Sequence, residues 1–526
     1  MPARCAIPFF LIGVLAASCT TNPGSLPAGY PTYDPFVPVQ GTGLSVDGNL
    51  TQAPLPTRTA GPTPTFAPLT ISIPTRNPSA PLVTPTPDFP RTLPTPRLAA
   101  AQYVVQAGDS LGSIAQVYGI SVEELERANN LTNSSVLSIG QTLDVPAPSP
   151  GGTGSAYKII PDSELVYGPA SAQFDIAAFV QARNGYLANY SQDVNDETLT
   201  GAQVVQRIAQ DYSVNPRLLL ALLEYRSKWV TSAEPANGTA DYPLGFVEPN
   251  HVGLYHQLSW AANQLNRGFY LWRVNAVGNW VLGDGTVMPV DPTINAGTAG
   301  VQSMFSVLDD RQTWNTDVTA FGLFQTYFLL FGNPFDLALE PLLPPNLSQP
   351  RMDWPFEAGS NWAFTGGPHA GWDSGSAWAA LDFAPSDVMG CAMSQEWVTA
   401  AANGFIVRAS NGAVIEDLDG DGYEQTGWDI LYMHMAAEGR VSAGSYVTVG
   451  DRIGHPSCEG GIANAAHLHL VRKYNGEWIG ADGKLPFVLR GWTSSGNGTE
   501  YDGFLKRGTT TLEAAEGITA DNQISP

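Results

Sequence analysis

His467-Leu468-His469-Leu470-Val471 is a short apolar run in which two histidines stand two residues apart. Alternate residues of a β-strand project from the same face of a sheet, so both imidazoles are expected to face one site. The leucine and valine beside them are typical of a buried strand. The stretch therefore predicts a β-sheet that carries a pair of histidines on one face.

Two other segments offer groups that could join these histidines. Gly366-Gly367-Pro368-His369 is expected to be a glycine-rich turn whose histidine can reach a metal. In Ala379-Ala380-Leu381-Asp382-Phe383-Ala384 one carboxylate interrupts an apolar strand, and a buried carboxylate needs a partner. Two imidazoles and one carboxylate leave a fourth position for water, as in a catalytic zinc site. Because no His-Glu-x-x-His sequence is present, a thermolysin-type arrangement is excluded.

The surrounding region, residues 349–515, is rich in glycine and in short alternating apolar segments. Gly404–Arg408 and Trp428–His434 are examples, and turn residues recur between such segments. This pattern predicts an antiparallel β-sheet domain. Residues 516–526 are expected to be a tail.

These motifs resemble the lysostaphin-type and β-lytic zinc endopeptidases. The resemblance implies a zinc cofactor, with His369, Asp382 and His469 as metal ligands and His434 and His467 as catalytic residues. Most of that family places the aspartate four residues after the first histidine, which here would be Asp373. The β-lytic branch has a longer insertion that fits Asp382, and we favour Asp382 because it lies in an apolar strand.

The N-terminus predicts export, and export bears on the cysteines. Leu15-Ala16-Ala17-Ser18-Cys19 follows a short apolar run and resembles a bacterial lipoprotein signal, so residues 1–19 are interpreted as a signal peptide with lipidation at Cys19. A plain secretory signal is the alternative. The expected location is the cell envelope, with a lipid anchor in the membrane. Outside the cytoplasm, Cys391 and Cys458 are expected to form a disulfide.

Residues 20–100 contain 18 of the 42 prolines and many threonines. Proline lacks a backbone donor and fixes its own φ angle, so this segment is expected to be a disordered, extended tether.

Residues 101–148 resemble the LysM module. The resemblance lies in Tyr103–Leu111, Ala128–Leu131 and Ile139–Leu143, and the spacing of apolar residues predicts strand, helix, helix and strand. It implies a β-α-α-β fold that binds the glycan of peptidoglycan. The implied glycan-binding residues are Gly108, Asp109, Ser110 and Leu111, with a second loop at 130–137.

Residues 156–348 have helical spacing, with stripes at Val204–Ala209 and Leu218–Leu223 and a helix start at Asn215 before Pro216. The second stripe faintly resembles the helix of lysozyme-like lytic transglycosylases. Those enzymes carry a catalytic glutamate just before a serine, but here Arg226 precedes Ser227 and the nearest glutamate is Glu224. We therefore expect an inactive helical domain that packs or holds substrate.

An acidic segment, Asp417-Leu418-Asp419-Gly420-Asp421-Gly422, spaces three carboxylates two residues apart, as calcium loops do. Its twelfth position is Trp428 instead of glutamate, so it is not an EF-hand. A calcium site in a hairpin and a solvated hairpin tip both remain open.

The chain is predicted to be a multidomain α+β protein: a small β-α-α-β module, a mainly helical centre and a C-terminal antiparallel sheet. With 25 basic and 48 acidic residues and a net charge of −23, it is a poor candidate for binding nucleic acid. The leading interpretation is a zinc-dependent endopeptidase acting on the peptides of peptidoglycan. The alternatives are a non-catalytic peptidoglycan-binding or hydrolase-activating protein, and a glycan-cleaving enzyme.

Overall fold

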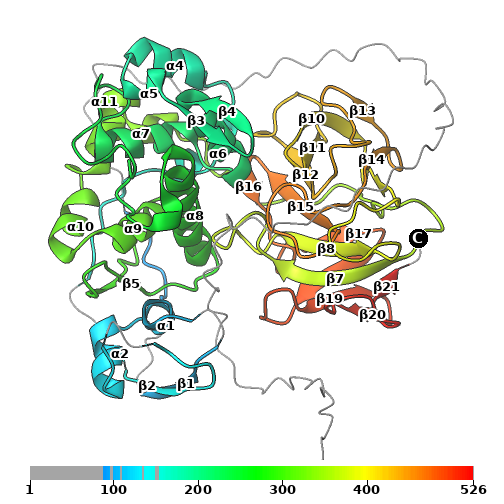
Figure 1. Ribbon diagram of the computed structural model, residues 1–526, viewed down its shortest axis with the longest axis horizontal. Coiled ribbons are helices and arrows are strands. Elements are labelled where there is room, and N and C mark those ends of the chain that lie inside the picture. The colour runs from blue at the N-terminus through cyan, green and yellow to red at the C-terminus, as the bar shows by residue number, and fades with distance from the viewer. Residues whose placement is uncertain (1–86, 95–98, 107–108, 133–135, 148–152, 525–526) are drawn as a thin grey trace, which may run out of the picture.

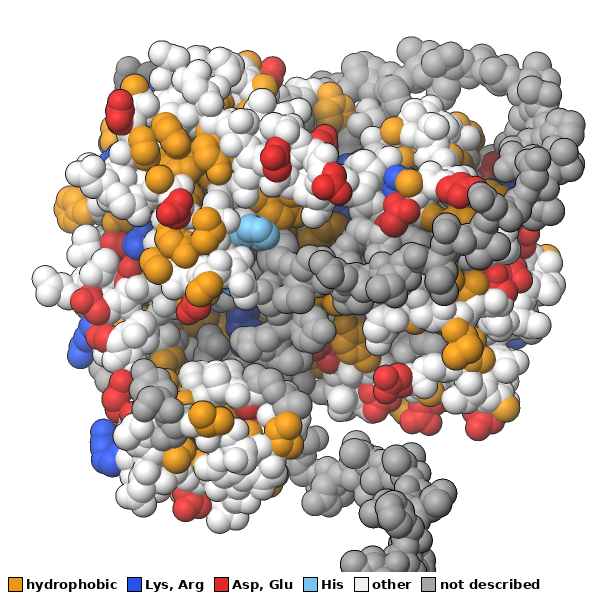
Figure 2. Space-filling view, viewed as in Figure 1, with side chains coloured by type: hydrophobic (Ala, Val, Ile, Leu, Met, Phe, Trp, Pro, Cys, Tyr) orange, Lys and Arg blue, Asp and Glu red, His pale blue; other side chains and the backbone are white. Residues whose placement is uncertain are grey.

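The computed structural model describes residues 87–94, 99–106, 109–132, 136–147 and 153–524. They form a small N-terminal module, a helical region and a region of antiparallel sheets (Figure 1). Acidic side chains outnumber basic ones on the face seen in Figure 2, in keeping with the net charge. In the part of the chain that is described, no helix is both long and apolar enough to cross a membrane.

The small module has the predicted β-α-α-β order, which is confirmed. Its elements are β1 (Ala101–Val104), α1 (Leu111–Tyr118), α2 (Val122–Asn129) and β2 (Thr142–Val145), and β1 pairs antiparallel with β2. A capping box between Ser121 and Glu124 starts α2, and Asn130 ends it in the left-handed conformation that asparagine tolerates. Ile114, Leu125 and Leu143 lie in its core.

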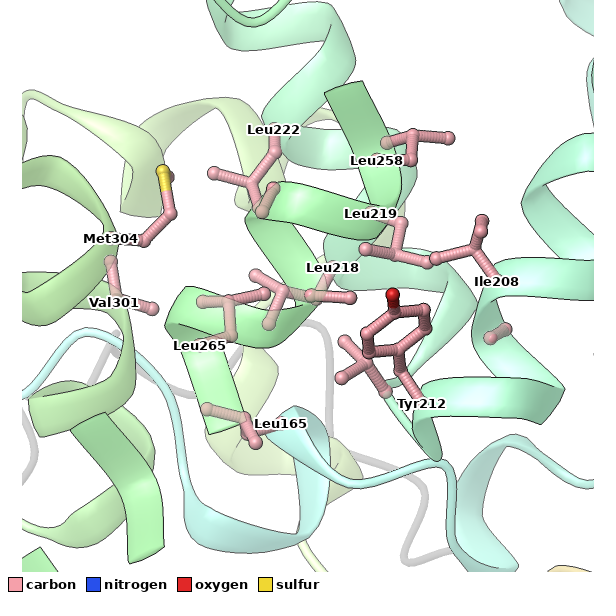
Figure 3. Close-up of a cluster of buried hydrophobic side chains, with 14 of the residues drawn as sticks. Leu165, Ile208, Tyr212, Leu218, Leu219, Leu222, Leu258, Leu265, Val301 and Met304 are labelled. Atoms are coloured by element: carbon pink, nitrogen blue, oxygen red, sulfur yellow. The ribbon is translucent and has the colours of Figure 1, made fainter. Parts of the chain in front are cut away.

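The helical region is built around α7 (Pro216–Ser227), which begins after the N-cap Asn215 as predicted. Every residue from Leu218 to Leu223 is buried, so α7 is covered on all sides instead of on one stripe. Figure 3 shows side chains of α6 (Gly201–Tyr212), α8 (Leu254–Arg273) and α9 (Ala296–Leu308) closing over it. The other elements are α3 (Asp162–Leu165), η1 (Pro169–Ser171), α4 (Ile176–Arg183), α5 (Tyr186–Asn189), β3 (Ser191–Val194), β4 (Glu197–Thr200), η2 (Pro249–His251), β5 (Asn279–Val281), β6 (Val287–Pro289), α10 (Arg311–Asp317), α11 (Leu323–Phe331) and η3 (Pro334–Leu337).

The C-terminal region is antiparallel throughout its described strands, as predicted. Its main sheet has the order β13-β10-β11-β12-β15-β8-β7-β21, with β16 paired to β15. Those strands are β7 (Trp362–His369), β8 (Ala380–Pro385), β10 (Gly404–Ser410), β11 (Ala413–Asp417), β12 (Trp428–Met433), β13 (Tyr446–Val447), β15 (Leu468–Tyr474), β16 (Glu477–Trp478) and β21 (Gln523–Ile524). A four-stranded sheet comprises β17 (Val488–Leu489), β18 (Trp492–Gly496), β19 (Gly503–Arg507) and β20 (Thr510–Glu513), and a pair comprises β9 (Val398–Thr399) and β14 (Arg452–Gly454).

Two expectations about the ends of the folded regions are wrong. The segment expected to be a tail contributes β21, which pairs with β7, and its buried Asn522 donates to the carbonyl of Phe364. At the other end, part of the expected disordered tether lies on the helical region. There the amides of Asp88 and Arg91 donate to the carbonyls of Thr293 and Pro292, because the residues between prolines keep their donors.

The helical region and the main sheet share one hydrophobic core. Ile415, Leu431, Val471 and Trp478 of the sheet lie in the same buried cluster as the helical residues, while the alternate residues of the same strands face a second core. Hydrogen bonds cross this junction, including that of the Ser213 hydroxyl to the carbonyl of Gly476. One face of the main sheet is therefore covered in part by the helices.

Candidate metal centre

Three neighbouring strands bring together the predicted metal ligands. His369 ends β7, Asp382 lies in β8, and His469 in β15 stands directly opposite Asp382. All three side chains are buried. The sequence predicted a turn at Gly366–His369, but the segment is an irregular end of β7 with two register shifts against β8.

The three ligand atoms converge closely. His369 Nε2 lies 3.0 Å from His469 Nδ1 and 3.2 Å from Asp382 Oδ1, and His469 Nδ1 lies 3.1 Å from the same oxygen. Zinc bonds of about 2.0–2.1 Å at tetrahedral angles put neighbouring ligand atoms roughly 3.3 Å apart. The arrangement therefore fits a zinc ion with only a small outward movement of the side chains.

The second nitrogen of each ligand ring is held by a backbone carbonyl. His369 Nδ1 lies 2.8 Å from the oxygen of Gly367, and His469 Nε2 lies 3.1 Å from that of Gly371. A ring nitrogen that donates to a carbonyl carries the proton, which leaves the lone pair on the nitrogen that faces the cluster. Both rings are thus set in the tautomer that a metal requires.

The two predicted catalytic histidines border this cluster. His434 follows β12 directly, and His467 precedes β15, with their ring centroids 4.5 Å apart. His467 Nε2 lies 3.6 Å from Asp382 Oδ1. Carbonyls hold Nδ1 of both rings, Glu459 for His434 at 3.0 Å and Ala465 for His467 at 2.8 Å. In both rings, Nε2 is therefore the nitrogen left to act at the site.

His434 has a φ of +66°, a left-handed conformation that is costly for a residue with a Cβ. Such strain persists only where surrounding contacts enforce it. Here the His434 carbonyl accepts from both the amide and the hydroxyl of Ser457. The backbone is thus fixed in the geometry that points the imidazole at the cluster.

Burial and mutual charge set the pKa values of the site. Burial alone would raise the pKa of Asp382, but the charges of His369 and His467 and the histidine hydrogen bonds hold it well below its usual range. Burial, followed by the charges of His467 and His469, lowers the pKa of His434 well below its usual value. Asp382 is therefore ionised at neutral pH, and His434 is neutral.

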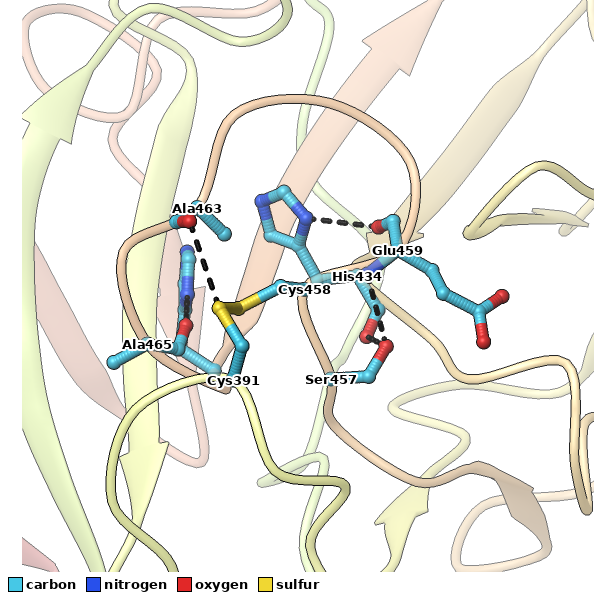
Figure 4. Close-up of a disulfide and its surroundings, with 8 residues drawn as sticks. Cys391, His434, Ser457, Cys458, Glu459, Ala463 and Ala465 are labelled. Carbon is cyan, nitrogen blue, oxygen red and sulfur yellow. Dashed lines mark hydrogen bonds between the residues drawn. A yellow bond between two sulfur atoms is a disulfide. The ribbon is translucent and has the colours of Figure 1, made fainter. Parts of the chain in front are cut away.

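Cys391 and Cys458 are joined in a disulfide (Figure 4). Cys458 lies between Ser457 and Glu459, the two residues whose polar atoms hold His434. The disulfide therefore ties the segment that orients His434 to the loop that follows β8.

Tyr501 is a site residue that the sequence did not indicate. Its ring stacks on His369 with centroids 4.2 Å apart, its φ is +66°, and its side chain is half exposed. The Gly367 amide donates to its carbonyl. Tyr501 follows His369 by more than a hundred residues with no motif around it, so only the fold reveals the contact.

The remaining candidates have structural contacts elsewhere. Asp373 accepts a hydrogen bond from the hydroxyl of Tyr212 in the helical region and is not in the cluster, which favours Asp382. His455 Nδ1 lies 2.9 Å from the carbonyl of Glu396. Glu224 is buried, and its carboxylate accepts from the amides of Val230 and Thr231 and from the Thr231 hydroxyl. Glu224 is thus engaged by the backbone that follows α7.

In the small module, the structure describes three of the four predicted glycan-binding residues, because Gly108 lies outside the described residues. Asp109 accepts hydrogen bonds from the Tyr103 hydroxyl and the Gln106 amide. Ser110 bonds Ser113, and Leu111 is buried in the core. The side chain of Leu111 thus supports the module.

The signal segment and Cys19 also lie outside the described residues, and lipidation stays a prediction.

Asp417, Asp419 and Asp421 are brought together at the turn between β11 and β12, with one oxygen of each within 4.8 Å of the others.

Family comparisons match two parts of the chain. Residues 103–146 match the family model of the LysM domain, which confirms that resemblance. Residues 158–346 match the family model described as LasA, N-terminal domain. The latter covers the region where the sequence faintly resembled lytic transglycosylases.

Curated relatives share short segments with this chain. The N-acetylmuramoyl-L-alanine amidase XlyA of Bacillus subtilis is 45% identical over 47 residues, which is 9% of this chain and 16% of that protein. The probable autolysin SsaALP of Staphylococcus aureus is 46% identical over 55 residues, which is 10% of this chain and 20% of that protein. The chain thus spans a fifth or less of these relatives.

Among solved structures, the M23 metalloprotease pseudoalterin is 24% identical, with 32% of this chain and 96% of that chain covered and a TM-score of 0.27. The catalytic domain of lysostaphin from Staphylococcus simulans is 25% identical, with 23% and 89% covered and a TM-score of 0.17.

Proposed function

We propose that this protein is a zinc-dependent endopeptidase of the cell envelope that cleaves the peptide stems or cross-bridges of peptidoglycan. The observation that carries the proposal is the convergence of His369 Nε2, His469 Nδ1 and Asp382 Oδ1 at 3.0–3.2 Å. Two imidazoles and one carboxylate form the ligand set of a catalytic zinc site with one open position.

The metal, when bound, supplies a Lewis acid that polarises a scissile carbonyl and makes water a better nucleophile. The chain's own residues supply the proton transfers. Neutral His434, with its proton fixed on Nδ1, accepts a proton or a hydrogen bond at Nε2. His467 offers its Nε2 from the β15 side, 3.6 Å from Asp382 Oδ1. A ring that has taken up a proton at Nε2 becomes a donor for the negative charge that develops on a scissile carbonyl.

Peptidoglycan as the substrate is supported by the rest of the chain. A LysM domain at residues 103–146 would hold the protein on the glycan and raise the local concentration of wall peptides. Relatives that share a short segment carry the names amidase and autolysin. These observations favour an exported cell-wall hydrolase over a peptidase that cleaves proteins of many kinds.

Zinc content and amine release from purified peptidoglycan test the proposal, with Asp382→Asn compared with Asp373→Asn. Wild type should hold about one zinc per chain and release new amino groups, and Asp382→Asn should lose both. Asp373→Asn is the matched control, because the same charge is removed 9 residues earlier from an aspartate that bonds Tyr212 instead of the cluster. Zinc-free wild-type protein that releases no amine but pellets with the wall would refute the proposal and favour a wall-binding protein.

A further inference from the structure

A second group of carboxylates lies at the far end of β12 from His434. Asp417 ends β11 and stands directly opposite Asp429, the second residue of β12. Directly opposed residues of an antiparallel pair project from the same face of the sheet. Their carboxylates therefore share one face, beneath the turn that carries Asp419 and Asp421.

Asp429 is the unusual member of this group. It is fully buried, and neither of its carboxylate oxygens has a hydrogen-bond partner among the described residues. Burying a carboxylate without partners is costly, so a buried charge is normally paired or bound to a metal. Lys473 stands opposite Asp429 on β15, but its ammonium pairs with Glu424 Oε2 at 3.3 Å.

The other three aspartates converge on one another, and Asp417 stands directly opposite Asp429. Oxygens of Asp417, Asp419 and Asp421 lie within 4.8 Å of one another. Backbone amides fix Asp417, because those of Asp419, Gly420 and Gly422 all donate to its oxygens. A Cβ on Gly427 would come within 2.0 Å of Asp419 Oδ2, so Asp419 is folded back over the start of β12.

The pKa values of Asp429 and Asp419 are raised, as expected where several carboxylates lie together without enough positive charge. Burial raises the pKa of Asp429 well above its usual value; the Lys473 charge opposes the shift, and Asp417, Glu424 and Asp419 increase it. Burial, with the hydrogen bond and charge of Asp417 and the charge of Asp421, raises the pKa of Asp419 to about 8. Without a cation, this end of the sheet must therefore hold protons at neutral pH.

We propose that Asp417, Asp419, Asp421 and Asp429 bind a calcium ion. The donor set is oxygen only, which excludes a zinc preference and suits a hard cation. Several converging carboxylates favour calcium, which takes about six to eight oxygen ligands, over magnesium, which keeps most of its water. The site is separate from the zinc ligands and goes beyond the proposed peptidase activity.

The position of the site suggests what the ion would do. Glu424, which follows the acidic turn, pairs with Arg408, and Arg408 also bonds Asp211 of the helical region at 2.8 Å. A cation at the turn would neutralise the negative charge beside this bridge. Calcium should therefore stabilise both the β11–β12 hairpin and its junction with the helices.

Calorimetric and thermal titration of the zinc-loaded full chain with calcium chloride tests the proposal. Calcium should bind once per chain and raise the melting temperature by roughly 3–5 °C at a hundredfold excess over its Kd. Equal magnesium should have little effect. Asp429→Asn should melt higher than wild type without calcium, because the fold no longer has to take up a proton at this buried carboxylate, and should show no calcium shift. Asp521→Asn, an exposed aspartate far along the chain, is the matched control and should behave as wild type.

No saturable calcium shift in wild type would overturn the proposal, as would an equal shift with magnesium or an undiminished shift in Asp429→Asn. If Asp429→Asn does not fold, the partly exposed Asp421→Asn decides the matter. Its calcium midpoint should rise at least tenfold, and an unchanged midpoint would overturn the proposal. Because all readings use zinc-loaded protein and no substrate, failure here leaves the proposed peptidase activity untouched.

Discussion

Replacing Trp478 by alanine should weaken both the junction of the two regions and the metal centre. Trp478 lies in β16, is buried in the core shared with the helices, and stands opposite Lys473 of β15. Its indole Nε1 donates to the carbonyl of Tyr212, a bond lost with the ring, while its backbone amide donates to the hydroxyl of Tyr270 and keeps that bond in the variant. The ring also lies against Gly371, where an added Cβ would come 3.2 Å from Trp478 Cε3.

The magnitude follows from these contacts. Losing a buried tryptophan side chain typically costs about 3–5 kcal/mol of unfolding free energy. Losing the indole hydrogen bond adds little to this free-energy cost, because the Tyr212 carbonyl keeps a second donor, the side-chain amide of Asn266. Trp478→Phe should therefore cost only about 1–2 kcal/mol. For a cooperative unit of this size, a loss of about 4 kcal/mol lowers the melting temperature by about 5 °C.

The metal centre should respond because Gly371 supplies the carbonyl that holds His469 Nε2. With the ring removed, Gly371 loses its support, and zinc affinity should fall up to about tenfold, the lower end of the effect of losing an outer-shell partner. Scanning calorimetry and competition with a zinc chelator measure the two effects.

Trp354→Ala is the matched control for Trp478→Ala. Trp354 lies in the second core, on the other side of the main sheet, so its loss should destabilise the protein similarly without changing zinc affinity. A loss below about 1 kcal/mol in Trp478→Ala, with unchanged zinc affinity, would refute the shared-core argument.

Three further predictions concern single contacts. His434→Ala should keep zinc near one per chain but lower kcat by about 10²–10⁴, as measured by amine release; loss of zinc would contradict its assignment. Glu416→Gln should stabilise the protein increasingly from about pH 4.5 to 8, because burial raises the pKa of Glu416 to about 8 and the folded state loses stability as the unfolded chain ionises first. Urea midpoints at pH 5 and pH 8 should differ less in that variant than in wild type. Replacing Cys391 and Cys458 by serine should cost about 2–4 kcal/mol, because the bond closes a loop of 67 residues, and an unchanged urea midpoint without reductant would contradict this.

The sequence predicted those features that local patterns encode. Alternation around His467 and His469 predicted one shared face, and both rings do lie within 3.6 Å of Asp382 Oδ1. The capped start of α7 at Asn215 was readable because an asparagine before proline is a local signal. The choice of Asp382 over Asp373 also rested on local context, an apolar strand against a glycine-rich loop.

Contacts between distant segments left no such signal. Tyr501, with a φ of +66°, stacks on His369 although no motif surrounds it. The two residues of β21 pair with β7 after a segment with no regular spacing of apolar residues. The sequence predicted one apolar stripe on α7, whereas the structure covers the helix on all sides. Periodicity shows where apolar residues lie, but not how many neighbouring elements cover them. The shared core of helices and sheet was equally hidden, since Trp478 reads as one aromatic in a short hairpin.

The strand β15 explains why these features are linked. From the metal centre towards β16, the strand and the residue before it place His467, His469, Val471 and Lys473 on one face, because alternate residues of an extended chain project together. The first two border Asp382, the third lies in the core shared with the helices, and the last faces Glu424 beside the acidic turn. Since neighbouring side chains on one rigid strand must move together, packing at Val471 fixes the spacing between the two charged ends. A substitution at the helical junction should therefore alter the geometry of the metal centre more than the packing of the second core on the opposite face.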